Sequence, residues 1–458
     1  MNALLIVCGL GFVSLLAEII NFKKGLHVLI ILGLIGAVVM VVKDWNSPLH
    51  YFNNMVAFDQ FSMAFTCLII VVAVAWFCIS SPYFINQSHQ TDRTALVVFT
   101  IVGAIMMVSF HNMAMLFLGI EILSISLYVL AGSNKESFFS NEAAFKYFIM
   151  GSFATGFLLM GIALVYGATG SFDITKISEH VEVQRAALPG FFYIGIFLIL
   201  IGLAFKISAV PFHFWAPDVY AGSPTLITAF MSTVVKIAAV AAFYKIFAQC
   251  FLPVQASVVS TVQLIIVLTL LIANITAVYQ NSVKRMLAYS SVAHVGYILL
   301  GLISDSGKFE GPLFYYLASY AATSLVAFGI LYVVENANGS SSVESFAGLY
   351  KRNPFAAICV TVALLSLAGI PPFAGFFAKY TVLALAIEAH YIGLVIFAVI
   401  TSLIGVCYYF RPIIATFSPG AKESQLHLDV LQKFTIAILT VLILLIGLFP
   451  DTLIGILG

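Results

Sequence analysis

Charged side chains are scarce in this sequence. Only 9% of its 458 residues are charged, whereas 62% are hydrophobic. A soluble domain carries about 25% charged residues, so the chain lacks the polar surface that a water-exposed protein needs. Its formal net charge is +1 and it has no long run of Lys or Arg, which argues against an electrostatic nucleic-acid-binding surface. Lipid is therefore the expected solvent for most of the chain.

The sequence also lacks paired cysteines, nucleotide-binding motifs and a recognisable leader. Its six cysteines lie singly in apolar stretches, so we expect no disulfide, iron–sulfur cluster or zinc site. No Gly-x-Gly-x-x-Gly follows a strand-like segment, so we expect no dinucleotide site. The first apolar run begins at Ala3 with no basic segment before it, and we interpret it as a retained membrane helix.

Long hydrophobic runs are what the sequence has in abundance. A membrane-spanning helix needs about 20 mostly apolar residues. Fourteen stretches meet this requirement: 2–20, 25–42, 60–79, 94–110, 112–131, 142–167, 188–208, 224–247, 257–279, 286–303, 311–334, 354–386, 390–414 and 433–457. The loops between them are short. The sequence therefore predicts an all-α polytopic membrane protein with one membrane domain over residues 1–458.

The distribution of Lys and Arg predicts how this protein is oriented, because cytoplasmic loops carry an excess of basic residues. With the N-terminus outside, eleven basic residues fall in inward loops and five at outward positions. The inward ones are Lys23, Lys24, Arg93, Lys135, Lys284, Arg285, Lys351, Arg352, Arg411, Lys422 and Lys433, and the outward ones are Lys43, Lys176, Arg185, Lys245 and Lys308. We therefore expect both termini on the periplasmic side of a bacterial inner membrane.

Two pairs of similar segments predict an internal repeat. LFLGIEILSISLYVLAG from Leu116 aligns without gaps with RMLAYSSVAHVGYILLG from Arg285. VPFHFWAPDVY from Val210 resembles IPPFAGFFAKY from Ile370 in the spacing of its proline and aromatic residues. Both pairs are separated by a similar length of chain, which indicates one unit that occurs twice.

The two copies would be residues 94–247 and 257–414, with five helices each. Because five is odd, the second copy would be inverted in the membrane. Inverted repeats with helices interrupted by Pro or Gly are typical of transport proteins. We expect two broken helices, one at Pro211 and one at Pro371-Pro372.

Five charged residues stand out once the loops are assigned, four remaining lysines and the one acid clearly in the middle of a predicted helix. They are Glu121, Lys146, Lys206, Lys236 and Lys379. A charge at the centre of a bilayer costs roughly 2.5–3.5 kcal/mol on insertion scales, so such groups usually face a bundle interior or a hydrated path. The set favours a path for protons over a purely structural role, and a membrane scaffold has no need of it.

The positions of the three deepest lysines strengthen this interpretation. Lys206 and Lys379 lie beside the predicted breaks, where unwound backbone must be satisfied by protein or water. A lysine there can release its proton, although Lys206 at a helix end could instead extend to the membrane interface. Lys236 lies about a dozen residues into its helix, too deep to reach the interface.

The remaining candidates are open to two interpretations each. Glu121 is either a proton-carrying carboxylate or a structural contact between helices. Lys146 lies one turn into its predicted helix and either belongs to the path or extends to the interface. His294 is either a satisfied core histidine or a step in a proton wire. A further group after Lys206, namely His213, Trp215 and Asp218, could simply anchor the chain at the interface.

One long motif resembles a known family. KISAVPFHFWAPDVYAGSPTLITAFMSTVVKIA (Lys206–Ala238) is similar to the signature of the antiporter-like subunits of NADH–quinone oxidoreductase, a fold that also occurs in Mrp-type cation/proton antiporters and membrane-bound hydrogenases. LGIEILSISLYVL and SLAGIPPFAGFFAKY resemble the family's motifs on its fifth and twelfth helices. The resemblance extends over essentially the whole chain.

The resemblance implies a role for each buried charge. Glu121 and Lys206 would form a charged pair that Lys146 modulates, Lys236 would be the central relay, and Lys379 would face the exit side. The chain is too short for the long lateral helix that one family member carries. It also has Lys379 at a position where another family member typically has Glu. In both respects the chain resembles the family's shorter subunit, which has neither the lateral helix nor this Glu.

The resemblance also implies partners and cofactors. This subunit itself is expected to hold no cofactor, metal or quinone. NAD, FMN, iron–sulfur clusters and quinone belong to the parent complex, and the partners would be its K-type and M-type membrane neighbours and the lipid bilayer.

Three classes of function remain open at this point. The first is a proton-translocating subunit of a redox enzyme. An Mrp-type cation/proton antiporter or membrane-hydrogenase subunit would use the same lysines. A solute transporter would gather its polar groups at one central cavity, whereas here the charges are spread over five predicted helices.

Overall fold

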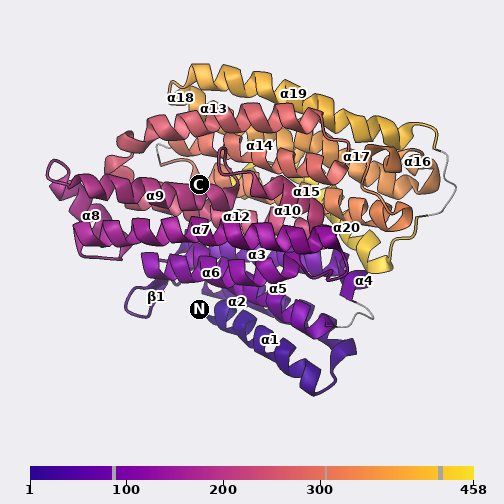
Figure 1. The fold of residues 1–458 in the computed structure, drawn as a ribbon, viewed down its shortest axis with the longest axis horizontal. Helices are drawn as coiled ribbons and strands as arrows, with labels where there is room; N and C mark the ends of the chain where they lie inside the picture. Colours follow the sequence, from indigo (N-terminus) through magenta and orange to yellow (C-terminus); the bar gives the residue numbers. More distant parts are fainter. Residues whose placement is uncertain (85–88, 305–306, 421–425, 458) are drawn as a thin grey trace. The chain divides into compact units, whose positions relative to one another are not determined.

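The computed structural model describes residues 1–84, 89–304, 307–420 and 426–457. Helices account for most of them. In chain order these are α1 (Asn2–Ile19), α2 (Lys23–Asp44), α3 (Gln60–Ile79), α4 (Ser81–Phe84), α5 (Gln90–Ser109), α6 (Met113–Ala131), α7 (Phe138–Thr169), α8 (Ile174–Gln184), α9 (Gly190–Ile207), α10 (Trp215–Gly222), α11 (Thr225–Phe230), η1 (Met231–Val235), α12 (Lys236–Tyr244), η2 (Lys245–Cys250), η3 (Leu252–Val254), α13 (Ala256–Val278), α14 (Val283–Ile303), α15 (Glu310–Asn338), η4 (Val343–Phe346), α16 (Leu349–Arg352), α17 (Pro354–Ala368), α18 (Ala374–Glu388), α19 (Ile392–Phe417), α20 (Val430–Leu448) and α21 (Asp451–Ile454) (Figure 1).

The predicted spans are confirmed. Thirteen helices of the described residues are long and apolar enough to cross a membrane, and the fourteenth predicted span is the interrupted pair α17 and α18. The predicted end of the last span at residue 457 was wrong. Helix α20 ends at Leu448, just before Phe449-Pro450, because proline cannot donate to the preceding helical turn.

Two small elements were not predicted. The strands β1 (Leu49–Tyr51) and β2 (Val56–Phe58) form an antiparallel hairpin between α2 and α3, so the fold is all-α except for this pair. Helix α8, in the segment that we expected to be a loop, is amphipathic and buries Ile174, Ile177 and Val181. Both elements belong to connections between membrane helices and leave the predicted class of the fold unchanged.

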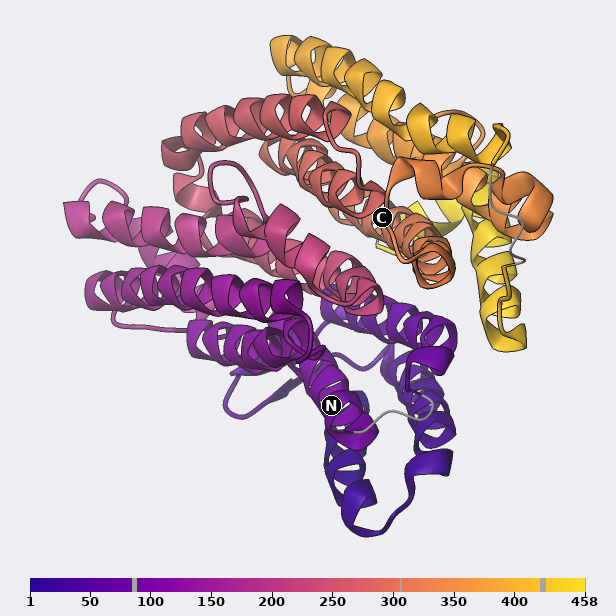
Figure 2. The same ribbon diagram turned by 45° about the vertical axis from the view of Figure 1, so that its right-hand side comes forward.

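The chain divides into two units, of which the first consists of Met1–Val74, Asn86–Trp215 and Val234–Leu264. Helices α7 and α9 of this unit lie side by side (Figures 1 and 2). A Cβ atom added at Gly161 of α7 would lie 2.7 Å from the carbonyl oxygen of Gly195 of α9. Small residues let membrane helices approach this closely, and α7 turns Phe145 and Phe153 outward, where apolar side chains suit lipid.

The second unit consists of Ala75–Ile85, Ala216–Thr233 and Ile265–Gly458. In α14 and α15, 94% of the residues of the most apolar stretch are buried, and these two helices form the core of the unit. Helices α17 and α18 are the two halves of one interrupted helix. Gly447 of α20 packs directly on the backbone of Pro372 and Ala374 at the interruption.

Both predicted helix breaks are present, and their local geometry is alike. Helix α9 ends at a left-handed Ser208 and α17 at a left-handed Gly369. In each, the next residue donates its N–H to the carbonyl five residues earlier, at 2.8 Å for Ala209 and 3.1 Å for Ile370. A proline follows three residues after each of these left-handed caps. The inverted repeat stays a prediction, and the matching segments are offset by one residue from our alignment of Val210 with Ile370.

The second break depends on a glycine. Gly375 donates its N–H to the Ser366 Oγ at 3.1 Å, and a Cβ atom there would overlap the Ser366 carbonyl oxygen. Gly375→Ala is therefore expected to destabilise the protein by about 1–3 kcal/mol, as overpacking does, and to lower the midpoint of its thermal aggregation in detergent. Gly393→Ala is the matched control, since nothing lies within 4 Å of that position. Equal midpoints for the two variants would contradict the prediction.

Candidate functional site

Lys206 lies in the interior of the first unit, at the C-terminal end of α9. It is 5% exposed, and its Nζ donates a hydrogen bond to the Ser124 Oγ of α6 at 2.6 Å. The rings of Tyr128, Tyr147 and Phe205 surround the ammonium at 5.9–6.0 Å. Such ring faces attract a cation. Burial against these groups rules out the interpretation that Lys206 extends to the membrane interface.

Glu121 belongs to the same cluster through Ser124, one turn later on α6. Lys206 hydrogen-bonds Ser124 and not Glu121. Ser124 in turn donates to the Ile120 carbonyl. The Glu121 Oε1 is buried without a hydrogen-bond partner among the described residues. The Ser124 hydroxyl, which can both accept and donate a hydrogen bond, therefore lies next to the predicted pair of Glu121 and Lys206.

The end of α9 is closed by aromatic residues. Trp215 stacks on Tyr147 at 4.6 Å and on Phe205 at 5.3 Å, and its Nε1 donates to the Phe205 carbonyl at 3.0 Å. That carbonyl also accepts the N–H of the cap residue Ser208 at 3.0 Å, so Trp215 adds a second donor at the end of α9. Trp215 is 3% exposed and His213 is 4% exposed. The suggestion that these two residues anchor the chain at the interface was therefore wrong.

Lys146 of α7 forms its ion pair outside the Lys206 cluster. Its Nζ forms an ion pair with Glu142, one turn earlier on the same helix, at 2.8 Å, and both side chains are more than a third exposed. Pairs at this spacing on a helix surface are stabilised only weakly. The predicted influence of Lys146 on Glu121 and Lys206 stays a prediction. Its chain neighbour Tyr147 contacts Lys206 through its ring.

Lys236 is 2% exposed. It is the first residue of α12, directly after the five-residue π-helical turn η1. Such turns are rare and occur frequently at functional sites. The preceding Ser232 and Thr233 hydroxyls both donate to the Ala229 carbonyl, at 3.0 and 2.7 Å, so they loosen the helix just before the lysine.

Lys379 lies at the second break, in the other unit. It is 8% exposed, and its Nζ donates to the Ala368 carbonyl at 2.9 Å and to the Ser402 Oγ at 3.2 Å. Ala368 is the last residue of α17, so the ammonium occupies the negative end of that half-helix, where a cation is favoured. Its Nζ also lies 5.1 Å from the centre of the Tyr297 ring.

His294 is part of a buried group of tyrosines in the same unit. Its Nδ1 and the Tyr316 hydroxyl are 2.7 Å apart, and its ring lies 5.0 Å from that of Tyr320 and 6.3 Å from that of Tyr297. Tyr297 contacts Lys379 as well, so this ring links the two predicted site residues. The sequence pointed to His294, and Tyr297 follows it three residues later on the same helix. The sequence gave no signal for Tyr316, which is on another helix.

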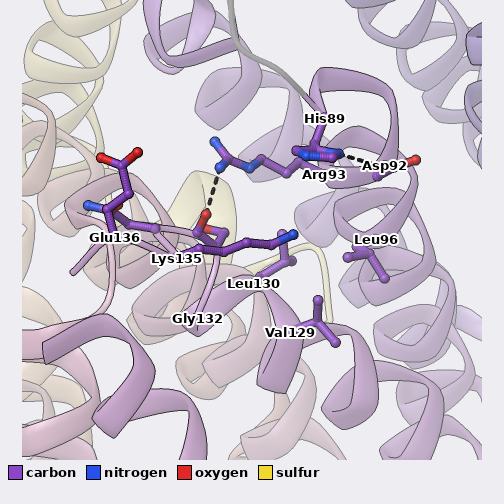
Figure 3. A pocket seen from close by; sticks show the side chains of 11 residues that line it. His89, Asp92, Arg93, Leu96, Val129, Leu130, Gly132, Lys135 and Glu136 are labelled. Atoms are coloured by element: carbon purple, nitrogen blue, oxygen red, sulfur yellow. Dashed lines mark hydrogen bonds and ion pairs between the residues drawn. The ribbon is translucent and has the colours of Figure 1, made fainter. Parts of the chain in front are cut away.

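One surface pocket of the first unit is lined by none of these groups. It encloses about 340 Å³ at the start of α5 and the α6–α7 loop, and Figure 3 shows its lining residues. Arg93 donates to the Ser133 carbonyl at 2.6 Å and His89 pairs with Asp92 at 3.4 Å. None of the predicted site residues lines it. Among the described residues no three His, Cys, Asp or Glu side chains gather as a metal site would require.

The fold and these buried charges define a multi-pass membrane protein with two interrupted helices, each carrying a lysine at its break. A family profile described as NADH:quinone oxidoreductase/Mrp antiporter, TM, matches residues 110–405. The chain belongs to this family. It is 46% identical over 461 residues to "NADH-quinone oxidoreductase subunit N" of Cytophaga hutchinsonii, covering 100% of this chain and 99% of the relative.

Solved structures agree with this assignment. A chain of respiratory complex I from Thermus thermophilus matches with a TM-score of 0.86 and 30% identity, over 100% of this chain and 99% of that one. A chain of the Mrp complex from Dietzia has a TM-score of 0.89 at 19% identity, over 100% of this chain and 96% of that one. The second likeness, at so low an identity, shows a shared fold alone.

Proposed function

We propose that this chain is the N-type subunit in the membrane arm of a bacterial NADH–quinone oxidoreductase, and that it carries protons as the complex transfers electrons from NADH to quinone. The observation that carries the proposal is the burial of Lys206, Lys236 and Lys379 in a chain with full-length similarity to N subunits. All three lysines are at most 8% exposed. Burying their charges in a membrane protein costs free energy, and such residues usually have a function.

The chemistry of the subunit is proton transfer without a redox step. A lysine can release its proton when its surroundings become less favourable for charge, whereas Arg cannot. In the first unit Glu121, Ser124 and Lys206 would exchange and hold a proton, and in the second His294, Tyr297 and Lys379 would do so. NAD, FMN, clusters and quinone belong to other subunits of the complex. Membrane neighbours of K and M type are the expected partners.

The same proposal includes the membrane in which the chain lies and its orientation there. The chain would lie in the bacterial inner membrane with both termini on the periplasmic side, as the eleven inward and five outward basic residues indicate. The competing assignment is an Mrp-type antiporter subunit, which would use the same lysines. The relatives that match over the full length favour the respiratory enzyme.

Co-purification tests the assignment. A tag on the chain's C-terminus, followed by solubilisation in a mild detergent, is expected to recover a complex that contains flavin, iron–sulfur clusters and NADH–quinone activity. Mass spectrometry of the purified material identifies the neighbours. Recovery of antiporter subunits without a flavoprotein, from membranes with normal NADH oxidation, would contradict the proposal in favour of an Mrp-type complex.

A further inference from the structure

A second cluster of titratable groups lies in the first unit, separate from Lys206. Its innermost member is Lys245, which is 1% exposed although it is near the end of its helix. Its Nζ lies 3.8 Å from a carboxylate oxygen of Asp59 and 3.4 Å from the Ser62 Oγ. It also lies 5.2 Å from the centre of the Phe110 ring. Its position in the sequence suggested an outward helix end, but its side chain is buried inside the unit.

The partner of this buried lysine lies at the surface of the unit. The Asp59 side chain is 43% exposed, against 1% for Lys245, so the pair joins the interior of the unit to its surface. Asp59 also accepts the Ser62 N–H at 2.7 Å. Burial raises the pKa of Asp59, but the charge of Lys245 and the hydrogen bonds from Ser62 outweigh it, and the pKa lies below its usual value. Asp59 therefore stays ionised and holds a positive charge at Lys245.

His111 is a further titratable group of this cluster, and its side chain is 18% exposed. It follows Phe110 in the chain, its Nε2 lies 3.1 Å from the Thr175 Oγ1 and 3.8 Å from the Asp173 carboxylate, and its ring lies 5.5 Å from that of His50. Burial lowers the pKa of His111, and Asp173 offsets part of this effect. At neutral pH its imidazole is therefore mostly neutral and can accept a proton.

Backbone contacts hold these groups at one end of the unit. Isolated bridges pair Val56 with Phe110 and Asn112 with Asp173, and His111 donates its N–H to the Met55 carbonyl at 3.0 Å. The segments come from connections after the second, fourth and sixth spans, and Lys245 is near the end of the eighth. Connections after even-numbered spans lie on one side of a membrane, the same side as the N-terminus.

We propose that Lys245, Asp59 and His111 form a proton-exchange port between the interior of the first unit and water on the side of the N-terminus. This inference rests on the proposed function. Helix α12, which leads into Lys245, packs against α5 and against α9, the helix that carries Lys206. A proton arriving in this interior adds a second positive charge, and like charges in a low-dielectric interior favour release of one proton.

The step conserves protons and charge. An N–H bond of the Lys245 ammonium breaks and leaves a neutral amine, the proton binds the neutral imidazole of His111, and the imidazolium then releases it to water. The Asp59 and Asp173 carboxylates stabilise the positive charge in transit. Uptake is the same sequence in reverse. A lysine suits the inner position, since an arginine would keep its proton.

The test is to replace Lys245 by two residues that separate charge from proton transfer. Lys245→Arg keeps the ion pair with Asp59 and cannot release a proton, whereas Lys245→Met removes both. In everted membrane vesicles containing equal amounts of the assembled complex, both variants are expected to lower NADH-driven proton pumping about tenfold or more. Lys176→Arg, an exposed residue near the same cluster, is the control and is expected to pump normally.

Each outcome decides between a port and a structural pair. Wild-type pumping in Lys245→Arg would overturn the proposal, because an ion pair alone would then suffice. If neither Lys245 variant assembles, His111→Gln replaces them. Normal pumping in that variant would also overturn the port. Lys236→Met in the same vesicles separates this inference from the proposed function. Loss of pumping there together with normal Lys245→Arg rejects the port alone, and normal pumping in Lys236→Met rejects the proposed function.

Discussion

Lys236→Ala is expected to abolish most quinone-coupled NADH oxidation and proton pumping while the complex still assembles. Lys236 is 2% exposed and follows a π-helical turn, so its ammonium lies where a charge is expensive. Removing it removes that desolvation cost, and alanine is the residue that helices favour most. The variant should therefore lose function before it loses structure.

The measurement compares turnover and pumping with the amount of complex. Membranes carrying Lys236→Ala are assayed for quinone-coupled NADH oxidation and proton uptake, and native gels give the content of assembled complex. Lys43→Ala, at an exposed lysine near the end of α2, is the control and is expected to leave both rates unchanged. Lys236→Arg should be as impaired as the alanine variant, because Arg keeps its proton. Wild-type rates in Lys236→Ala would contradict a relay role.

The membrane helices could be predicted from the sequence because apolar runs and prolines determine them locally. Each break was predicted from a proline and appears where α9 and α17 end. The residue at the first cap could not be predicted, since it is Ser208, in a left-handed conformation that glycine normally takes. The hairpin β1–β2 was missed because its strands have only three residues each.

The partners of the site residues are the part that the sequence could not supply. Lys379 donates to Ala368, eleven residues away, only because the interrupted helix brings the end of α17 towards it. Lys245 meets Asp59 across 186 residues of chain. Charge in an apolar run identified the candidates, since burial of a charge is unusual wherever it occurs. Which hydroxyl or carboxylate satisfies that charge depends on packing between helices distant in sequence.

Glu121→Gln and Lys206→Met are expected to be less damaging together than their separate effects predict. Each charge favours the charged form of the other when both are buried nearby. Removing one strands the other in a low-dielectric interior, which costs about 3–5 kcal/mol for a well-buried pair. The single variants should therefore lower the thermal stability and the amount of the assembled complex, and the double variant should recover part of both.

Ser124 makes this test sharper, because Lys206 hydrogen-bonds its hydroxyl and not Glu121 directly. Ser124→Ala removes one hydrogen bond to a charged group, worth about 1.5–3 kcal/mol, but leaves both charges in place. If Glu121 and Lys206 interact electrostatically, the double-mutant cycle should show a coupling of about 1 kcal/mol or more in the serine and alanine backgrounds alike. If the hydroxyl alone connects them, the coupling should vanish in Ser124→Ala. Strict additivity of the two single variants in both backgrounds would show that the two residues act independently.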